Sequence, residues 1–356
     1  MRKTSTLSPH RKASPLCTAV LAAGLALLAG CGSSDNQQSA GMAPKLMIIN
    51  MFAAEAAPFR QTLNLTQRIP VGGLSSRYPE VLCSEDGVCQ VVTDMGYANA
   101  ASSIAALLYN SAFDLRNTYF LIAGIAGINP NQGTLGSAAW ATYLVDYSLS
   151  HEIDAREMPT GWNTGYFGIG SASPQQKPPF DYHTEVFQLN ATLANRAYTL
   201  SKNVVLSDSP ETQAFRARYA QAPANQPPRV IACDSVSSDT WFAGKALATR
   251  AEEWAKLLTD GAATYCTTQQ EDNATLEALR RGAAAGKLDL KRVMALRSGS
   301  DMDRPYPGQS DADVLVNYAS QGGFAPATRN LALAAAPVIR EIVNNWDTWK
   351  AGVPAQ

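Results

Sequence analysis

Acidic side chains border apolar stretches of this sequence at three places that are far apart in the chain. They are Glu55, the triplet Glu271-Asp272-Asn273, and Asp301. Carboxylates at the ends of buried strands face one edge of an open α/β sheet, which is where such sheets bind small molecules. The three places are therefore candidates for one small-molecule site. None is specific alone, and Glu55 considered by itself is better explained as an acidic group that stabilises the N-terminus of a helix.

A fourth candidate is the apolar stretch 119–130. It breaks at Gly124 and Gly127 and ends in Asn-Pro, which predicts a buried strand that leads into a glycine loop. Glycine lacks the Cβ that would keep a ligand away from the backbone, so Gly124 and Gly127 are expected to bind substrate, together with Ala126 between them. The alternative is a tight turn below a core strand.

Two adjacent aromatic residues, Trp241 and Phe242, follow a run of small polar residues after the short apolar stretch 229–233. Such side chains suit stacking on a flat heterocycle, and packing of the next helix is the equal alternative. Paired cysteines or histidines at the spacings that bind metals do not occur in the sequence, so we expect no metal site.

The elements that must position these residues alternate along the chain. Apolar runs of strand length are followed by amphipathic helical patterns, which predicts an α/β fold whose sheet has a central parallel portion. The segment 159–179 is rich in Gly, Pro and Ser and predicts a long loop. Besides the strand that opens the stretch 119–130, the predicted strands cover 45–52, 81–83, 88–93, 140–145, 229–233 and 293–297. The predicted helices cover 96–108, 184–201, 211–220, 246–258, 276–281, 311–319 and 326–346.

The composition is that of a soluble globular protein. Of 356 residues, 46% are hydrophobic and 17% are charged, so one large domain is expected. The formal net charge is -1 and no basic run interrupts the body of the chain. We therefore expect no nucleic-acid partner.

Residues 1–30 have the features of an export signal, with basic residues ahead of a short apolar segment. Leu28-Ala29-Gly30-Cys31 looks like a bacterial lipobox, which predicts a lipoprotein signal peptide over 1–30, lipid attachment at Cys31, a flexible tether over 31–44 and a folded domain over 45–356. The expected location is the bacterial cell envelope, on the periplasmic face of the outer membrane. The lipid at Cys31 would be the only contact with the membrane.

Cysteine spacing predicts disulfides in an exported chain. Cys83 and Cys89 flank Asp86-Gly87, a hairpin turn signal, and are expected to form a bridge across that hairpin. A second bridge between Cys233 and Cys266 rests only on their inferred positions near strand ends.

Taken in chain order, these features resemble the nucleoside phosphorylase and nucleosidase fold. The loop at Gly124 looks like the glycine loop of that fold; residues 271–275 stand where it has Glu-Met-Glu-Ala-Thr, and residues 297–301 where it has Arg-x-Ile-Ser-Asp. More narrowly, residues 268–275, Asp234-Ser235 and residues 297–301 are similar to the purine nucleoside permease family. That resemblance covers essentially the whole chain after the tether and implies a single large three-layer α/β/α domain with a central mixed sheet.

The resemblance also implies roles for individual residues. Asp301 would be the acid that protonates a purine at N7, and Glu55 matches the glutamate with which nucleosidases activate water. Glu271 would accept hydrogen bonds from the ribose hydroxyls. Trp241 and Phe242 would stack on the base.

The sequence departs from the family pattern in two respects. If Ala274-Thr275 is the anchor, the sugar-binding glutamate falls on Asn273, so Glu271 or Asp272 has that role only in another register. No arginine corresponds to the phosphate clamp of the phosphorylases. Phosphate therefore stays open as a co-substrate but water is favoured, and no other cofactor is expected.

Two functions are compatible with the sequence. One is an enzyme that binds purine nucleosides and cleaves the N-glycosidic bond, by hydrolysis rather than phosphorolysis. The other is an uptake component that binds purine nucleosides and passes them to a transporter without cleavage, as the uptake role described for the family suggests. Base preference and assembly into a homo-oligomer stay open.

Overall fold

The computed structural model describes residues 41–354, so the predicted signal peptide, Cys31 and most of the predicted tether lie outside the described residues. The packed chain begins before Lys45. Met42 forms a β-bridge with Phe113, and its N–H donates to the carbonyl of Ala112 at 2.8 Å.

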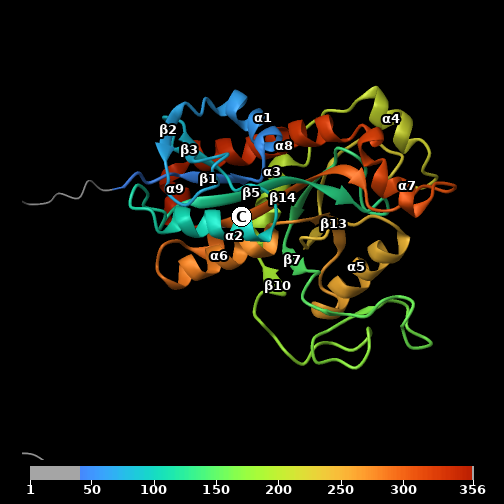
Figure 1. The fold of residues 1–356 in the computed structure, drawn as a ribbon. Helices are drawn as coiled ribbons and strands as arrows, with labels where there is room; N and C mark the ends of the chain where they lie inside the picture. The colour runs from blue at the N-terminus through green and yellow to red at the C-terminus, as the bar shows by residue number, and fades with distance from the viewer. Residues whose placement is uncertain (1–40, 355–356) are drawn as a thin grey trace, which may run out of the picture. The chain divides into compact units, whose positions relative to one another are not determined.

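A mixed sheet of twelve strands passes through the described residues (Figure 1). Its main path has the order β10-β7-β12-β13-β5-β1-β4-β3-β2, and β14, β6 and β11 join it through β5. The strands of the described chain are β1 Leu46–Asn50, β2 Gln67–Pro70, β3 Glu80–Cys83, β4 Val88–Val92, β5 Tyr119–Ile128, β6 Ala138–Ala141, β7 Tyr143–Asp146, β8 His151–Glu152, β9 Tyr166–Phe167, β10 Val186–Gln188, β11 Val230–Ala232, β12 Asp234–Ser237, β13 Tyr265–Gln269 and β14 Val293–Met302, of which β8 and β9 form a separate pair.

Helices cover both faces of this sheet, which gives the three layers expected. Side chains alternate along β1, so Met47 and Ile49 pack with α2 and α6 on one face, while Leu46 and Ile48 pack with α1 and α8 on the other (Figure 1). The predicted three-layer α/β/α fold with a mixed sheet is confirmed. The α-helices of the described chain are α1 Ala53–Leu63, α2 Tyr97–Leu108, α3 Ala191–Ser201, α4 Pro210–Arg216, α5 Lys245–Leu258, α6 Asp272–Ala284, α7 Asp311–Val316, α8 Phe324–Asn344 and α9 Trp346–Ala351.

Two predictions about the central strands are wrong. β5 continues through Gly124 and Gly127, so these glycines lie in a strand and not in a loop. β14 continues to Met302, so Asp301 lies within the strand and not after it. The cause is that β5 and β14 pair in parallel along their length, with Gly124 opposite Arg297 and Gly127 opposite Asp301. The hydrogen bonds between these strands pair backbone N–H and C=O groups that would be left without partners in a turn.

Other boundaries also differ from the expected ones. The predicted helix over 184–201 is a strand, β10, followed by α3, because Asn190 caps that helix by accepting hydrogen bonds from the N–H groups of Thr192 and Leu193. The segments that form β12 and β13 were not recognised as strands. No helix within 41–354 combines the length and the apolar character that crossing a membrane requires.

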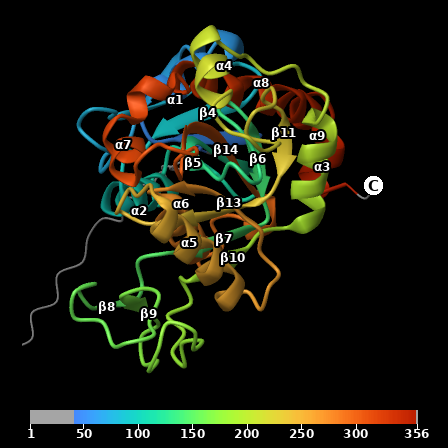
Figure 2. The same ribbon diagram turned by 90° about the vertical axis from the view of Figure 1, so that its right-hand side faces the viewer.

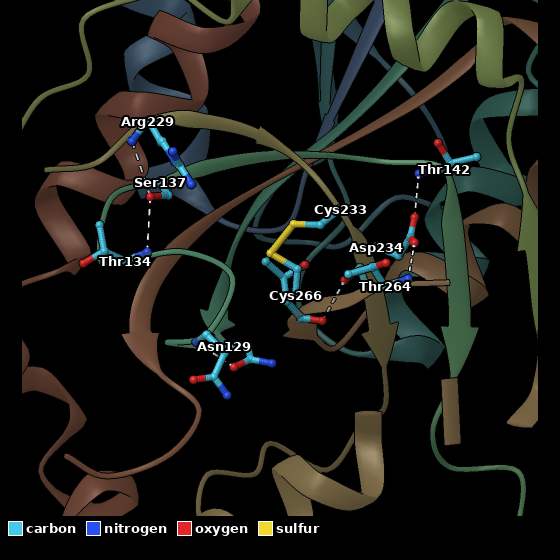
Figure 3. Close-up of a disulfide and its surroundings, with 12 residues drawn as sticks. Asn129, Thr134, Ser137, Thr142, Arg229, Cys233, Asp234, Thr264 and Cys266 are labelled. Carbon is cyan, nitrogen blue, oxygen red and sulfur yellow. Dashed lines mark hydrogen bonds between the residues drawn. A yellow bond between two sulfur atoms is a disulfide. The ribbon is translucent and has the colours of Figure 1, made fainter. Parts of the chain in front are cut away.

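Both predicted disulfides are present. Cys83 and Cys89 join β3 to β4 across their hairpin. Cys233 and Cys266 join the residue before β12 to the second residue of β13 (Figure 3). Beside this second bridge, the Asp234 carboxylate accepts from the N–H groups of Thr142 at 3.0 Å and Thr264 at 2.7 Å (Figure 3). The strands that lead into the candidate site are thus fixed to each other at their start.

Candidate functional site

A cavity of about 540 Å³ lies where β5, β13 and β14 end. Its size suits a small organic ligand. All four of the places first singled out in the sequence, namely Glu55, the stretch 119–130, the triplet 271–273 and Asp301, contribute at least one residue to its wall, together with apolar side chains. The lining residues are Met51, Phe52, Glu55, Met95, Ile125, Ala126, Gly127, Trp241, Thr268, Gln269, Gln270, Glu271, Ser300, Asp301, Tyr318, Ala319 and Phe324.

Asp301 presents an unpaired acceptor to this cavity. Its Oδ1 accepts a hydrogen bond from the Ser300 hydroxyl at 2.7 Å, while its buried Oδ2 has no partner among the described residues. Burial raises the pKa of this carboxyl from 3.8 to about 6; the Ser300 hydrogen bond opposes the rise and the nearby Asp303 carboxylate adds to it. Asp301 is therefore partly protonated near neutral pH and can donate a proton to a ligand.

Glu55 is fixed by two backbone groups at the start of α1. Its Oε2 accepts from the N–H of Met51 and its Oε1 from the N–H of Ile125, each at 2.8 Å. Burial raises the pKa of this carboxyl to about 7, although Arg297 lowers it, and the negative charge of Glu271 raises it further. A group with this pKa near neutrality can take a proton from water. Glu55 also lies in the first turn of α1, which is the position expected if its charge stabilises the N-terminus of that helix.

Arg297 is the cation that holds this acidic cluster together. It is 1% exposed, and its Nη2 donates to Asp272 Oδ1 at 2.5 Å and to Glu271 Oε2 at 3.4 Å. Its Nη1 donates to the carbonyl of Ile125 at 3.2 Å. The guanidinium thus links β14, β5 and the start of α6 directly behind the cavity wall.

Glu271 is the acidic residue of its triplet that reaches the cavity. Its Oε1 accepts from the N–H of Gly96 at 3.2 Å, and burial raises its pKa. Asp272 is fully buried, and its Oδ1 accepts a hydrogen bond from Arg297 Nη2. Asn273 points away from the cavity, since its Nδ2 donates to the Thr184 carbonyl at 2.8 Å. Of the triplet 271–273, only Glu271 therefore lines the cavity.

The two glycines of β5 act differently. A Cβ on Gly127 would lie 2.9 Å from Thr268 Cγ2 and 3.3 Å from Asp301 Oδ2, so the absence of a side chain leaves room beside that carboxylate. Gly124 does not line the cavity. A Cβ there would overlap the Arg297 guanidinium and lie 2.9 Å from Glu55 Oε1. Gly124 thus permits the ionic cluster to pack against β5.

The two adjacent aromatic residues separate. Trp241 is 38% exposed at the cavity, with its ring centroid 4.3 Å from that of Tyr318. Phe242 is 1% exposed and stacks on Tyr147 at a centroid distance of 4.7 Å. Phe242 is therefore a core residue, and the stacking expected of it is available to Trp241 alone.

The structure brings Glu55, Ala126, Gly127, Trp241, Glu271 and Asp301 to one cavity, and places Gly124, Phe242, Asp272 and Asn273 behind or away from its wall. Sequence reasoning did not single out Arg297 as a site residue, although a cation inside a buried strand is the signal that could have found it. It also missed Tyr318 and Phe324, which come from a helical region that follows the last strand and carries no local mark of a site.

The charged side chains in the cavity wall are all acidic. Glu55, Glu271 and Asp301 line it, and no lysine or arginine of residues 41–354 does so. Arg297 lies behind the wall, where Glu271 and Asp272 accept its hydrogen bonds. The arrangement suits an uncharged ligand better than an anion.

Comparisons with known proteins identify relatives and a related fold. The family model described as purine nucleoside permease matches residues 43–354. A purine nucleoside permease of Candida albicans is 40% identical over 315 residues, which cover 87% of this chain and 77% of that protein. A probable purine nucleoside permease of Schizosaccharomyces pombe is 39% identical over 322 residues, which cover 86% of this chain and 91% of that protein.

Among solved structures, a Helicobacter pylori 5′-methylthioadenosine/S-adenosylhomocysteine nucleosidase has a similar fold. The match has a TM-score of 0.53 and 14% identity, and covers 85% of this chain and 99% of the nucleosidase. At this identity the likeness concerns the fold alone.

These relatives correct the expected location. Residues 28–31 led us to expect a bacterial cell envelope protein attached by lipid to the outer membrane, and this expectation is wrong, because the matching relatives come from the yeasts Candida albicans and Schizosaccharomyces pombe. A short motif of four residues carries far less information than a match over most of the chain.

Proposed function

We propose that this chain, which belongs to the purine nucleoside permease family, binds purine nucleosides in the cavity between Glu55 and Asp301 and cleaves their N-glycosidic bond by hydrolysis. Family membership and the nucleosidase-like fold support the binding of nucleosides. The cleavage is our inference from the acidic groups of the cavity.

The observation that carries this proposal is the buried, unpartnered Oδ2 of Asp301 on the wall of a cavity that also holds Glu55 and Glu271. Asp301 lies opposite Gly127, whereas Arg297, which holds Glu271, lies opposite Gly124. Three residues along a strand correspond to about 10 Å, so a purine at Asp301 leaves space for its ribose near Glu271.

In the proposed reaction, the bond between ribose C1′ and purine N9 breaks and its electron pair stays with the base. Asp301 supplies a proton to N7 and stabilises the leaving purine. Water forms the new bond to C1′ and gives a proton to Glu55, while Glu271 accepts hydrogen bonds from the ribose hydroxyls. The products are free purine and ribose.

Water is the proposed nucleophile rather than phosphate. The cavity wall carries three carboxylates, which repel an anion, and a pKa of about 7 for Glu55 suits proton transfer from water. Phosphorolysis would require a cationic group to hold phosphate beside the sugar.

The test is to incubate the full chain with inosine, adenosine and guanosine, with and without phosphate, and to measure free base. We expect base release that does not depend on phosphate. Release only with phosphate would overturn the hydrolytic step. Saturable nucleoside binding without base release would instead favour the second candidate, a nucleoside-binding component of uptake that leaves the bond intact; the name shared by the two yeast relatives favours that candidate.

A further inference from the structure

The long segment 147–185 runs beside α5 (Figures 1 and 2). A second hollow, of about 610 Å³, is lined by residues of this segment, of α5 and of the turn that follows α5. It shares no lining residue with the cavity of the candidate site. Its wall combines two aromatic rings, two amides and two cations, which belong to Tyr166, Trp254, Asn163, Gln175, Arg250 and Lys256.

Arg250 is built into this wall. It is 4% exposed, and its guanidinium carbon lies 3.7 Å from the ring centroid of Tyr147 and 4.2 Å from that of Tyr166. Its Nη2 donates to the Tyr147 carbonyl at 3.0 Å and to the Ser150 hydroxyl at 3.3 Å. Its buried Nε has no hydrogen-bond partner in the described part of the chain.

The positive charge of Arg250 also lacks a counter-ion. Lys256, on the same wall, pairs with Glu252 at 3.1 Å, but Arg250 forms no ion pair with a carboxylate of residues 41–354. Glu253 lines the hollow as well, and its Oε2 accepts from Asn163 Nδ2 at 3.0 Å. A cation that is buried without an opposite charge destabilises the fold, and the two aromatic faces offset only part of that cost.

We propose that this hollow binds a small organic anion, whose carboxylate or phosphate group accepts a hydrogen bond from Arg250 and whose flat ring lies against Tyr166 and Trp254. The anionic group supplies the missing counter-charge. The rings of Tyr166 and Trp254 provide an apolar surface of the kind on which planar ligands stack. The amides of Asn163 and Gln175 orient the polar edge of the ligand. This site is independent of the function proposed for the first cavity.

Benzoate carries a carboxylate on a phenyl ring, and phenyl phosphate carries a phosphate on the same type of ring. Titration calorimetry of the full chain with each probe therefore shows which anionic group the hollow binds. We expect saturable binding of at least one probe. Arg250→Met keeps the apolar stem and removes the charge, and it should weaken that binding roughly 10- to 150-fold. Lys256→Met is the matched control and should change the affinity little, because Lys256 already has a partner.

Circular dichroism and the melting temperature show whether Arg250→Met folds. If it does not, Tyr166→Leu removes one wall of the hollow and should weaken binding of the same probe. The proposal is overturned if the wild-type chain binds neither probe saturably. It is also overturned if the folded variant binds the probe as tightly as the wild type, because Arg250 would then have a structural role only.

Discussion

The Arg297 guanidinium and the Asp272 carboxylate form an ion pair behind the cavity, with Nη2 2.5 Å from Oδ1 and with side chains that are 1% and 0% exposed. Because both charges are buried, each depends on the other. The pair fixes the guanidinium that also donates to Glu271, so the same buried cation stabilises the fold and positions a carboxylate of the cavity wall.

Replacing Arg297 with Met should destabilise the fold by about 3–5 kcal/mol, because Asp272 would keep a buried charge without a partner. The double variant Arg297→Met/Asp272→Leu should recover much of this loss. Arg281→Met is the control: Arg281 pairs with Glu277 but is 74% exposed, so its loss should cost about 0–1 kcal/mol. Urea unfolding of the four proteins measures these differences, and equal losses at positions 297 and 281 would contradict the assignment.

The stability of the protein should fall as the pH rises through the range in which Glu55 titrates. Burial raises the pKa of Glu55 from 4.5 to about 7, so between these values the folded chain binds more protons than the unfolded chain. The free energy of unfolding should therefore decrease by up to about 3 kcal/mol across this range because of this one group. Glu55→Gln cannot titrate, so its free energy of unfolding should fall less between pH 5 and pH 8 than that of the wild type. Parallel pH profiles would refute the raised pKa.

Asp301→Asn keeps the shape of the side chain but loses the proton that is transferred. If Asp301 is the acid, base release should fall about 10²- to 10⁴-fold, while nucleoside affinity changes by no more than a hydrogen bond, roughly 0.5–3 kcal/mol. Asp86→Asn, at an exposed position in the β3-β4 turn, should change neither quantity. Turnover, affinity and melting temperature are measured on both variants. Undiminished turnover in Asp301→Asn would remove this residue from the mechanism.

A methyl group at position 124 should disturb the ionic cluster without touching a ligand. The Cβ of Gly124→Ala would displace Arg297 and Glu55, and we expect a loss of about 1–3 kcal/mol in stability together with weaker nucleoside binding. Gly72→Ala is the control, because a Cβ there meets no atom within 4 Å. Thermal unfolding and equilibrium binding of both variants test this expectation, which fails if the two behave alike.

The two disulfides should contribute unequally to stability. Their sequence separations are 6 residues for Cys83–Cys89 and 33 residues for Cys233–Cys266. In the chain-entropy description, replacing both cysteines with serine should cost about 2 kcal/mol for the first bridge and about 4 kcal/mol for the second. Denaturant unfolding of the two double variants measures the order, and a larger loss for the shorter loop would contradict it.

The sequence was sufficient for features with a local signature. The apolar runs of β1 and β5 and the turn at Asp86-Gly87 each have a pattern that neighbouring residues determine. Pairing between distant segments has no such pattern. For this reason the glycines of β5 suggested a loop, whereas their partner strand β14 keeps them within the sheet.

The candidate site shows the same division. Glu55, Glu271 and Asp301 could be found because charged residues beside apolar runs are conspicuous. Which of two neighbours faces a cavity depends on packing against other elements, and so Trp241 and Phe242 could not be told apart.

The pairing of β14 with β5 also has a consequence for synthesis of the chain. Residues 129–292 separate the two strands, so a growing polypeptide on the ribosome can pair β1 with β4 and β5 long before β14 emerges. Until then one edge of β5 lacks its partner, and such unpaired edges invite association with other chains. Arg297 and Asp301 belong to β14 and are therefore synthesised together with that strand. Until residues 293–302 have been made, a nascent chain therefore lacks Asp301 and the ion pair between Arg297 and Asp272.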